Sequence, residues 1–229
     1  MEEKRIIALE EENKKLKEEI KTIKEELNTI KQKQTENDEI IKKLLKINED
    51  KEELKKINSK ILTAPEQFHF IEKLINEDNN LTIKKLELKL LYRATRDGGS
   101  SLQFHKKCDD INNTITLVKT KTGYIFGGFT SQKWNGNEYK SDDKAFCFSF
   151  DLNKKYNSKK TNNSIYCSRG IGPCFGDAFF WVNNNCFSEG GVITEFNICY
   201  DNQKEKNEIN NGQQKFAIEE VEVFQTNLS

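Results

Sequence analysis

The first sixty residues contain no aromatic residue, no glycine and no cysteine. All 23 aromatic residues of the 229-residue chain (15 Phe, 6 Tyr, 2 Trp) stand at Phe68 or later, the first glycine is Gly98, and the first cysteine is Cys108. These sixty residues hold 16 Lys or Arg and 16 Asp or Glu, so their net charge is zero. Such a segment is typical of a solvated helix, and one uniform globular fold is excluded.

Long apolar runs and clustered arginines are also missing. No stretch of 18 apolar residues occurs, and the charged start (Met1, Glu2, Glu3, Lys4) is not that of a secretory signal. We therefore expect neither a transmembrane segment nor export. The chain has 33 Lys but only 4 Arg at zero net charge, which argues against nucleic acid as a partner. These absences predict a cytoplasmic protein.

The first segment does have a heptad repeat of apolar residues. Its first eight a and d positions are apolar except for one Asn: Ile6, Leu9, Asn13, Leu16, Ile20, Ile23, Leu27 and Ile30. Glutamates stand at g and lysines at e of the next heptad: Glu12, Glu19, Glu26, and Lys17, Lys24, Lys31. A parallel homodimer pairs these opposite charges, whereas an antiparallel one pairs like charges. The repeat predicts a parallel coiled-coil homodimer with these eight residues at its interface.

Two alternatives stay open for the same segment. Ile23 and Ile30 at d positions favour higher oligomers, while Asn13 at an a position favours two strands. The other alternative is a monomeric charged helix without a partner.

The repeat changes character in the middle of the segment. It fails at Gln34 and Asn37, and a second apolar series follows in a shifted register: Ile40, Ile47, Leu54 and Ile61. Thr35, three residues before Asp38, is suited to cap a new helix. We therefore expect a hinge or stutter at residues 34–38 of a coiled coil that covers residues 1–60.

Residues 61–229 form a second domain that is long enough to bury a core. Pro65 ends the first helix, and the apolar spacing over residues 68–75 predicts a short amphipathic helix. Ser100 is suited to cap a further helix through Cys108. Alternating apolar residues predict strands at 86–92, 115–119, 123–129, 145–150, 164–167, 178–182, 192–198 and 216–224. This pattern describes an antiparallel sandwich of mixed, α+β class.

Five segments of this domain carry recognisable motifs. They are Leu90–Gly98 (LLYRATRDG), Gly123–Trp134 (GYIFGGFTSQKW), Ser141–Phe150 (SDDKAFCFSF), Gly172–Gly176 (GPCFG) and Phe216–Phe224 (FAIEEVEVF). Their succession, from Ile61 to Gln225, resembles the TLDc domain family, the domain of the eukaryotic oxidation-resistance proteins. The RDG and YIFGGFTSQKW segments are its most specific parts.

The resemblance implies a fold and a role. The fold is a two-sheet antiparallel β-sandwich flanked by helices, and the role is protein interaction without settled catalytic chemistry. Members of the family are linked to protection against oxidative stress and to binding and regulating the vacuolar proton-pumping ATPase. The resemblance therefore predicts a subunit of that pump as the partner, with the chain peripheral to endomembranes through it.

The RDG segment supplies the first candidate site. Arg93, Arg96, Asp97 and Gly98 stand where a strand gives way to a helix, and they form a candidate partner-binding or catalytic corner. The competing interpretation is a turn in which Asp97 binds backbone amides while an arginine pairs with it.

The YIFGGFTSQKW segment supplies the second candidate site. Gly127 and Gly128 inside a strand predict a bulge or a close backbone approach. Trp134, at the end of that strand, is the best candidate for an exposed partner contact, and a core position is the alternative.

His105, Cys108 and Asp109 could form a nucleophilic system. However, His105 and Cys108 lie on one helix face without an oxyanion-hole signature, so packing under the sandwich is favoured and no catalytic residue is assigned. The six cysteines include no C-x-x-C pair, so we expect no metal site, no cofactor and no structural disulfide. Cys174, in a turn beside Pro173, is the one candidate for a redox-sensitive thiol.

The sequence thus predicts a non-enzymatic adaptor, in which a coiled coil presents two interaction domains to a protein partner. Two alternatives stay open. One is an enzyme that uses a thiol or His105, and the other is a coiled-coil scaffold whose C-terminal domain only caps the rod.

Overall fold

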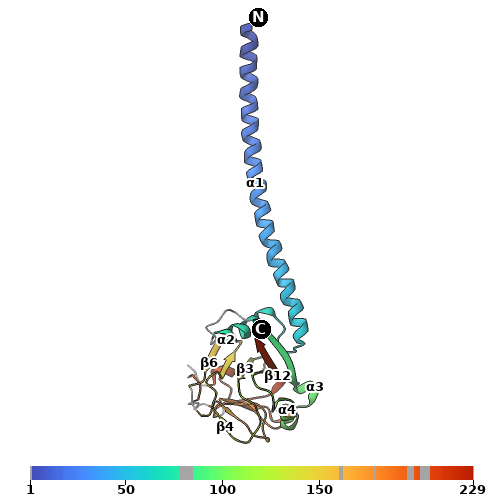
Figure 1. The fold of residues 1–229 in the computed structure, drawn as a ribbon, viewed down its shortest axis with the longest axis vertical. Helices are drawn as coiled ribbons and strands as arrows, with labels where there is room; N and C mark the ends of the chain where they lie inside the picture. The colour runs from blue at the N-terminus through green and yellow to red at the C-terminus, as the bar shows by residue number, and fades with distance from the viewer. Residues whose placement is uncertain are drawn as a thin grey trace. The chain divides into compact units, whose positions relative to one another are not determined.

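A computed structural model describes residues 2–77, 85–159, 162–177, 179–194, 199–201 and 207–228. The chain divides into two compact units, Met1–Lys51 and Glu52–Ser229. The first unit is helical, and the second holds two β-sheets with short helices (Figure 1). The predicted α+β class, with a long helix followed by an antiparallel sandwich, is confirmed.

Helix α1 runs from Glu2 to Ile57. Its sequence is rich in Glu, Lys and Ile and has no Gly or Pro, so nothing in it interrupts the helical backbone. The helix continues through residues 34–38, where Thr35 Oγ1 donates a hydrogen bond to Lys31 O at 3.0 Å. The prediction that Thr35 begins a new helix is therefore wrong. A change of heptad register within one continuous helix stays a prediction.

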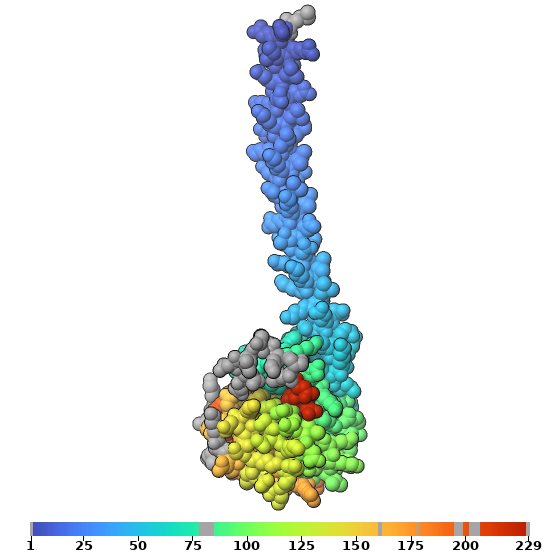
Figure 2. Space-filling view, in the orientation of Figure 1, coloured from blue at the N-terminus to red at the C-terminus, as the bar shows by residue number. Residues whose placement is uncertain are grey.

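The predicted interface residues of α1 are exposed in the single chain. Their apolar members range from 48% exposed at Leu27 to 61% at Ile23, and Asn13 is exposed as well. Figure 2 shows the side chains of α1 standing out along the helix. Large exposed apolar surfaces are uncommon on monomeric proteins and are typical of interaction sites. The coiled-coil pairing of this stripe remains a prediction.

A short connection leads from α1 into α2, Pro65–Asn76. Ser59 Oγ accepts the amides of Ile61 and Leu62 at 3.0 and 2.8 Å and turns the chain there. Proline is well suited to the first position of a helix because its missing N–H is not needed there. The predicted amphipathic helix is confirmed, and it buries Phe68, Ile71, Leu74 and Ile75.

Within the described residues, two antiparallel sheets of six strands each form the sandwich (Figure 1). The first sheet has the order β1-β12-β2-β3-β5-β6, with bounds Leu86–Arg93 (β1), Ile218–Leu228 (β12), Thr114–Thr120 (β2), Ile125–Thr130 (β3), Phe146–Ser149 (β5) and Lys154–Asn157 (β6). The second sheet has the order β11-β10-β9-β8-β7-β4, with bounds Lys215–Phe216 (β11), Gly191–Val192 (β10), Phe180–Val182 (β9), Cys174–Phe175 (β8), Ile165–Tyr166 (β7) and Tyr139–Lys140 (β4). The short helices are α3 (Ala94–Asp97), α4 (Ser101–Cys108) and α5 (Cys186–Glu189), with a 3-10 turn at Glu208–Asn210.

Two apolar clusters hold these layers together. One lies between the sheets, where Phe126 of β3 meets Phe180 of β9 edge to face at 5.4 Å. The other lies between the first sheet and α2, and it includes Ile71. Successive side chains of a strand point to opposite faces. Val118 of β2 therefore packs in the cluster between the sheets, and Leu117 packs in the cluster under α2. Each large apolar side chain buried in this way stabilises the fold by about 1.5–3 kcal/mol.

Most predicted strands are confirmed, while β4, β6 and β8 are additional. β6 has only one buried residue, Tyr156, so its sequence shows no alternation of apolar and polar residues. Residues 178 and 195–198 of the predicted strands lie outside the described residues. Ser100 does occupy the N-cap position of α4, but its side chain makes no capping hydrogen bond, so that detail of the prediction is wrong.

Candidate functional site

The corner between β1 and α3 is organised by Asp97. Its Oδ2 accepts the Arg93 backbone amide at 2.9 Å, and its two oxygens accept Arg96 Nε at 3.0 Å and Nη2 at 2.7 Å. Partial burial would raise the pKa of Asp97, but these hydrogen bonds and the nearby charges of Arg96 and Lys107 hold the pKa below its ordinary value. This geometry matches the second interpretation of the RDG segment, a turn in which Asp97 binds a backbone amide and pairs with an arginine. Arg96 and Gly98 are the exposed residues among the four candidates of this corner.

The side chain of Arg93 points into the protein. Its Nε donates to Glu222 Oε1 at 2.6 Å, and its Nη2 donates to the Asn58 carbonyl oxygen. Glu222 is fully buried on β12 and also accepts the Ser59 hydroxyl and, at 2.9 Å, the Lys60 amide. Arg93 therefore anchors the connection after α1 to the sandwich, and it offers no exposed charge to a partner.

Sequence reasoning missed Glu222 and its neighbour Glu220. Glu220 accepts the Thr95 amide at 3.0 Å and the Thr95 hydroxyl. A signal was present, because two glutamates at alternate positions of the FAIEEVEVF strand must lie on one face among buried residues. A buried carboxylate on such a face needs a cation or several donors.

The glycines of the candidate sites have structural roles. Gly98 has a φ of 101°, which an L side chain rarely adopts, and its carbonyl accepts the Tyr92 hydroxyl at 2.9 Å. A Cβ at Gly127 would stand 2.0 Å from Thr116 O, and one at Gly128 would stand 2.7 Å from the Phe175 ring. The predicted close backbone approach is present, and both positions are buried rather than open to a partner.

Trp134 is not an exposed contact residue. Its side chain is fully buried, and its Nε1 donates to Thr114 Oγ1 at 2.9 Å. The ring packs edge to face against Phe104 at 5.5 Å and Phe175 at 5.4 Å. The expectation that Trp134 is exposed is wrong, because β2, α4 and β8 all contact the indole. The alternative, a position in the core, is correct.

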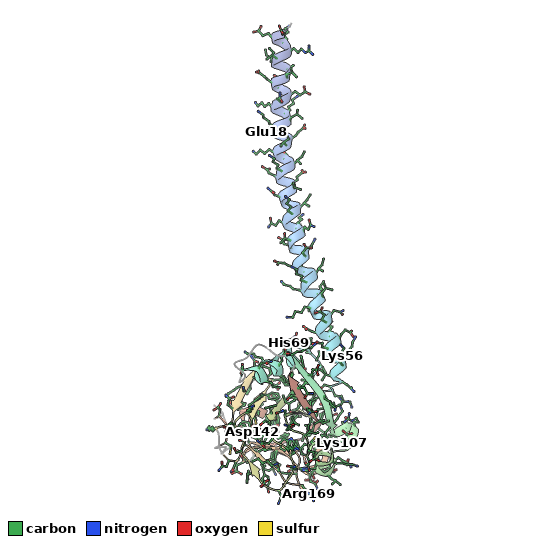
Figure 3. The ribbon with its side chains drawn as sticks, in the orientation of Figure 1. Glu18, Lys56, His69, Lys107, Asp142 and Arg169 are labelled. Atoms are coloured by element: carbon green, nitrogen blue, oxygen red, sulfur yellow. The ribbon has the colours of Figure 1, made fainter. Side chains whose placement is uncertain are left out.

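Asp142 organises a second polar site, which sequence reasoning also missed. This buried carboxylate accepts Thr130 Oγ1 at 2.6 Å, Ser131 N at 2.6 Å and Ser131 Oγ at 2.8 Å. Figure 3 shows Asp142 within the sandwich. The bonds tie the end of β3 to the chain before β5, which gives the TSQKW and SDDK segments a structural reason to occur together.

The geometry of His105 does not suit a catalytic base. Its Nδ1 lies 2.6 Å from Asp109 Oδ1, and its Nε2 lies 2.8 Å from Ser168 O and 3.0 Å from Ile171 O. Both ring nitrogens therefore face acceptors of the protein, and neither is directed at the Cys108 thiol. Cys108 is fully buried, and this burial raises the pKa of its thiol.

The six cysteines are all buried. Burial raises the pKa of Cys147, that of Cys167 to about 11 and that of Cys186 to about 12, so these thiols resist forming the reactive thiolate. Cys174 lies in β8 at 3% exposure, not in an open turn, so the expected access to its thiol is wrong. Within the described ranges, no group of three or more His, Cys, Asp or Glu side chains is placed to hold a metal ion.

No helix among the described residues is both long enough and apolar enough to cross a membrane.

Comparison with known proteins places the sandwich in a family. The model of the TLDc domain matches residues 55–227, a range that begins within α1, before the predicted boundary at residue 60. A similar protein is the MTOR-associated protein MEAK7 of Danio rerio, which is 36% identical over 62 residues. Those residues are 27% of this chain and only 14% of the relative. With the two six-stranded sheets and the family match over most of its length, the chain belongs to the TLDc domain family.

Proposed function

We propose that the chain is a non-enzymatic adaptor, whose sandwich binds a protein partner and whose α1 joins two copies in a parallel coiled coil. The observation that carries this proposal is the stripe of half-exposed apolar residues along α1, from Ile6 to Ile30. Glutamates and lysines flank the stripe at positions that are complementary only in parallel copies. Joining two sandwiches raises their avidity for a partner that presents clustered sites.

The dimer is tested by light scattering on the full chain. We expect twice the chain mass of 26.7 kDa for the wild type. Replacing Glu12, Glu19 and Glu26 by Lys sets like charges against each other, as does replacing Lys17, Lys24 and Lys31 by Glu. Each triple variant alone should be monomeric, and an equimolar mixture of the two should recover the dimer. A wild type that stays monomeric at micromolar concentration contradicts the proposal.

The direction of pairing has its own test. A Leu9→Cys variant places a thiol at a d position, where it meets its own copy in a parallel pair. We expect a rapid interchain disulfide under mild oxidation. In an antiparallel pair the two thiols lie at opposite ends of the rod, so no crosslink within the dimer would form.

We further propose that the chain works in the cytoplasm in protection against oxidative stress, and that its partner is a subunit of the vacuolar proton-pumping ATPase. Family membership supports this proposal. Affinity purification with the full chain as bait should recover pump subunits, and the monomeric charge variants should recover fewer because avidity is lost. Recovery of no pump subunit by the wild type removes this partner.

The two alternatives predict different results. An enzyme should lose a measured turnover when His105, Cys108 or Cys174 is replaced, although the burial of both thiols argues against this. A coiled-coil scaffold should keep its partner when the sandwich surface is altered and lose it when α1 is altered. The adaptor should respond to both changes.

A further inference from the structure

Strand β1 has one open side. It lies at the edge of the first sheet and pairs only with β12 within the described residues. The direction of its backbone groups follows from β12. Thr226 N donates to Asn113 O at 2.8 Å on the β2 side, so the backbone groups of Thr226 point toward β2. Because neighbouring residues of a strand alternate, those of Gln225 and Asn227 point toward β1.

The open edge can therefore be assigned residue by residue. Gln225 pairs with Lys89, and Asn227 pairs with Glu87, so Lys89 and Glu87 use their backbone groups on β12. The backbone groups of Leu86, Leu88 and Leu90 point away from the sheet, a row of donors and acceptors that can template another strand.

Side chains of the protein form hydrogen bonds with outward backbone groups at both ends of this edge but not in its middle. Three outward groups are taken: Leu86 N donates to Glu72 Oε1 at 3.3 Å, Leu91 O accepts Arg96 Nη2 at 3.0 Å, and Arg93 N donates to Asp97 Oδ2 at 2.9 Å. In the described part of the chain, the outward N–H groups of Leu88 and Leu90 and the carbonyl of Leu88 have no such partner. These three groups form an open window on the edge of β1, from Leu88 to Leu90, which is long enough to bind a short extended segment.

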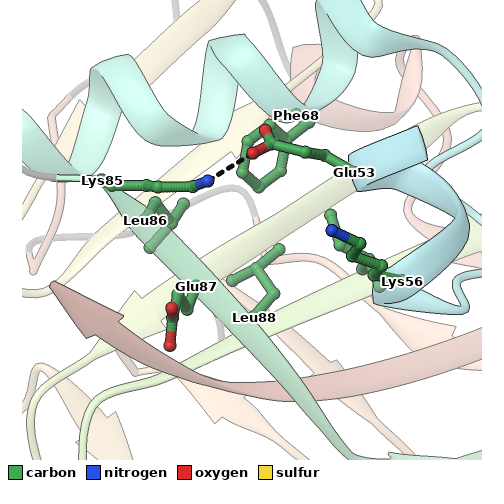
Figure 4. A pocket seen from close by; sticks show the side chains of 8 residues that line it. Glu53, Lys56, Phe68, Lys85, Leu86, Glu87 and Leu88 are labelled. Carbon is green, nitrogen blue, oxygen red and sulfur yellow. Dashed lines mark ion pairs between the residues drawn. The ribbon is translucent and has the colours of Figure 1, made fainter. Parts of the chain in front are cut away.

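A groove of about 300 Å³ adjoins this window. Its apolar lining comes from Ile57 of α1, Phe68 of α2, and Leu86 and Leu88 of β1. Figure 4 shows Phe68, Leu86 and Leu88 around the groove. A space of this size accepts one large apolar side chain. An open strand edge beside an apolar pocket is the arrangement by which domains bind extended peptides, with main-chain hydrogen bonds for affinity and the pocket for specificity.

The charges at the groove favour an acidic segment. Lys85 Nζ and Glu53 Oε1 pair at 2.5 Å and neutralise each other at one end (Figure 4). Lys56, also on the rim, is exposed and forms no ion pair with any described residue. A carboxylate of a bound segment would complement this ammonium group.

We propose that the groove binds an extended segment of a protein partner, which adds a strand beside Leu88 and Leu90. One apolar side chain of the segment fills the groove, and an Asp or Glu two residues away faces Lys56, since side chains on one face of a strand recur at every second residue. This inference rests on the proposed interaction role of the sandwich and names the surface that performs it.

The first test selects ligands without assuming a partner. A phage library of random heptapeptides is panned on the immobilised full chain, and enriched peptides are measured by fluorescence anisotropy. We expect an apolar residue with Asp or Glu two positions away. Lys56→Glu should weaken binding about tenfold or more, while Lys55→Glu, a change at the neighbouring exposed lysine, should stay within about twofold. No enriched family, or equal effects of the two variants, overturns the proposal.

The second test reads the strand directly. Amide exchange followed by NMR should slow at Leu88 and Leu90 when an enriched peptide binds, while Glu87 and Lys89 are already bonded to β12 and should not change. A Leu88→Pro variant removes one donor at an edge position that tolerates proline and should weaken binding about tenfold. Unchanged exchange at both leucines overturns the proposal. Slowing that instead follows chain concentration without peptide also overturns it, because it assigns the edge to a second copy.

These tests are independent of the proton pump. They use the purified chain and peptides, so a failure to recover pump subunits leaves their result intact. Conversely, recovery of pump subunits by a chain that binds no peptide would retain the adaptor role and reject this groove as its contact.

Discussion

Along α1, glutamates and lysines stand in solvent around an exposed apolar stripe, whereas in the sandwich Arg93 and Glu222 meet at 2.6 Å in the interior. The charges of α1 gain little within one chain, because exposed ion pairs contribute only about 0–1 kcal/mol. The charges of the sandwich cannot be separated without leaving one of them buried. The buried charges of the sandwich thus find their partners within a single copy, while the apolar stripe of α1 stays exposed in it.

The two regions can be followed separately in one sample. Both tryptophans, Trp134 and Trp181, belong to the sandwich, so tryptophan fluorescence reports on that unit alone. The circular dichroism signal at 222 nm is dominated by the 56 residues of α1. The two signals therefore allow the stability of the sandwich and the helicity of α1 to be followed separately.

The largest effect is expected from Arg93→Ala. This change leaves Glu222 buried without its cation, which costs about 3–5 kcal/mol of unfolding free energy. Urea unfolding followed by tryptophan fluorescence should shift accordingly, while the helical signal of α1 in the absence of urea should hardly change. The matched control is Lys119→Ala, which breaks the partly exposed pair with Glu219 at 2.8 Å and should cost less than about 1 kcal/mol. Equal losses in the two variants would contradict the difference between interior and surface charges.

A smaller effect is expected from Gly127→Ala. The added Cβ meets a backbone oxygen at 2.0 Å, which cannot rotate away, so β2 and β3 must separate. Overpacking of this kind costs about 1–3 kcal/mol of unfolding free energy. Gly170→Ala is the control, because a Cβ there meets nothing within 4 Å. A Gly127→Ala protein as stable as this control would show that the strands do not approach as closely as described.

An effect of about 1 kcal/mol at neutral pH is expected from Asp97→Asn, because charge-assisted hydrogen bonds are lost. The pKa of Asp97 is held below its ordinary value of 3.8, so its contribution is fully present above that pH and disappears as pH falls through the lowered folded pKa. The stability gap between wild type and variant should therefore be constant from about pH 5 to 7 and close in stronger acid. A gap that widens on acidification would contradict the pairing with Arg96.

The contrast between the two regions also explains how far sequence reasoning reached. The long helix was predictable because its periodicity is local, and so was the Asp97 turn, whose partners lie within four residues. The local pattern could indicate that Glu222 is buried but not which cation it meets, because Arg93 lies 129 residues away in the chain. Trp134 was misjudged for the same reason. Its burial depends on Phe104 and Phe175, which reach it only through the packing of α4 and β8.

The short strands show the same limit. β4 and β8 have two residues each, too few to display any alternation. β8 is held by β7, β9 and the packing of Phe175 in the cluster between the sheets, and β4 is held by β7, where Tyr139 contacts the Tyr166 ring at 4.6 Å. Both strands therefore emerge only at the tertiary level.

The smallest effect on the sandwich, close to zero, is expected from changing the seam of α1. Ile20→Asp together with Ile23→Asp places charges at a and d positions that are exposed in the single chain. In a dimer these charges would be buried against the other copy, so the chain should become monomeric and its helical signal should fall, because a long charged helix gains most of its stability from packing. The urea midpoint from tryptophan fluorescence should stay unchanged, since no tryptophan lies in that unit. A midpoint that moves with the seam would mean that the sandwich draws stability from the rod, and the division into a self-sufficient unit and a partner-dependent one would have to be given up.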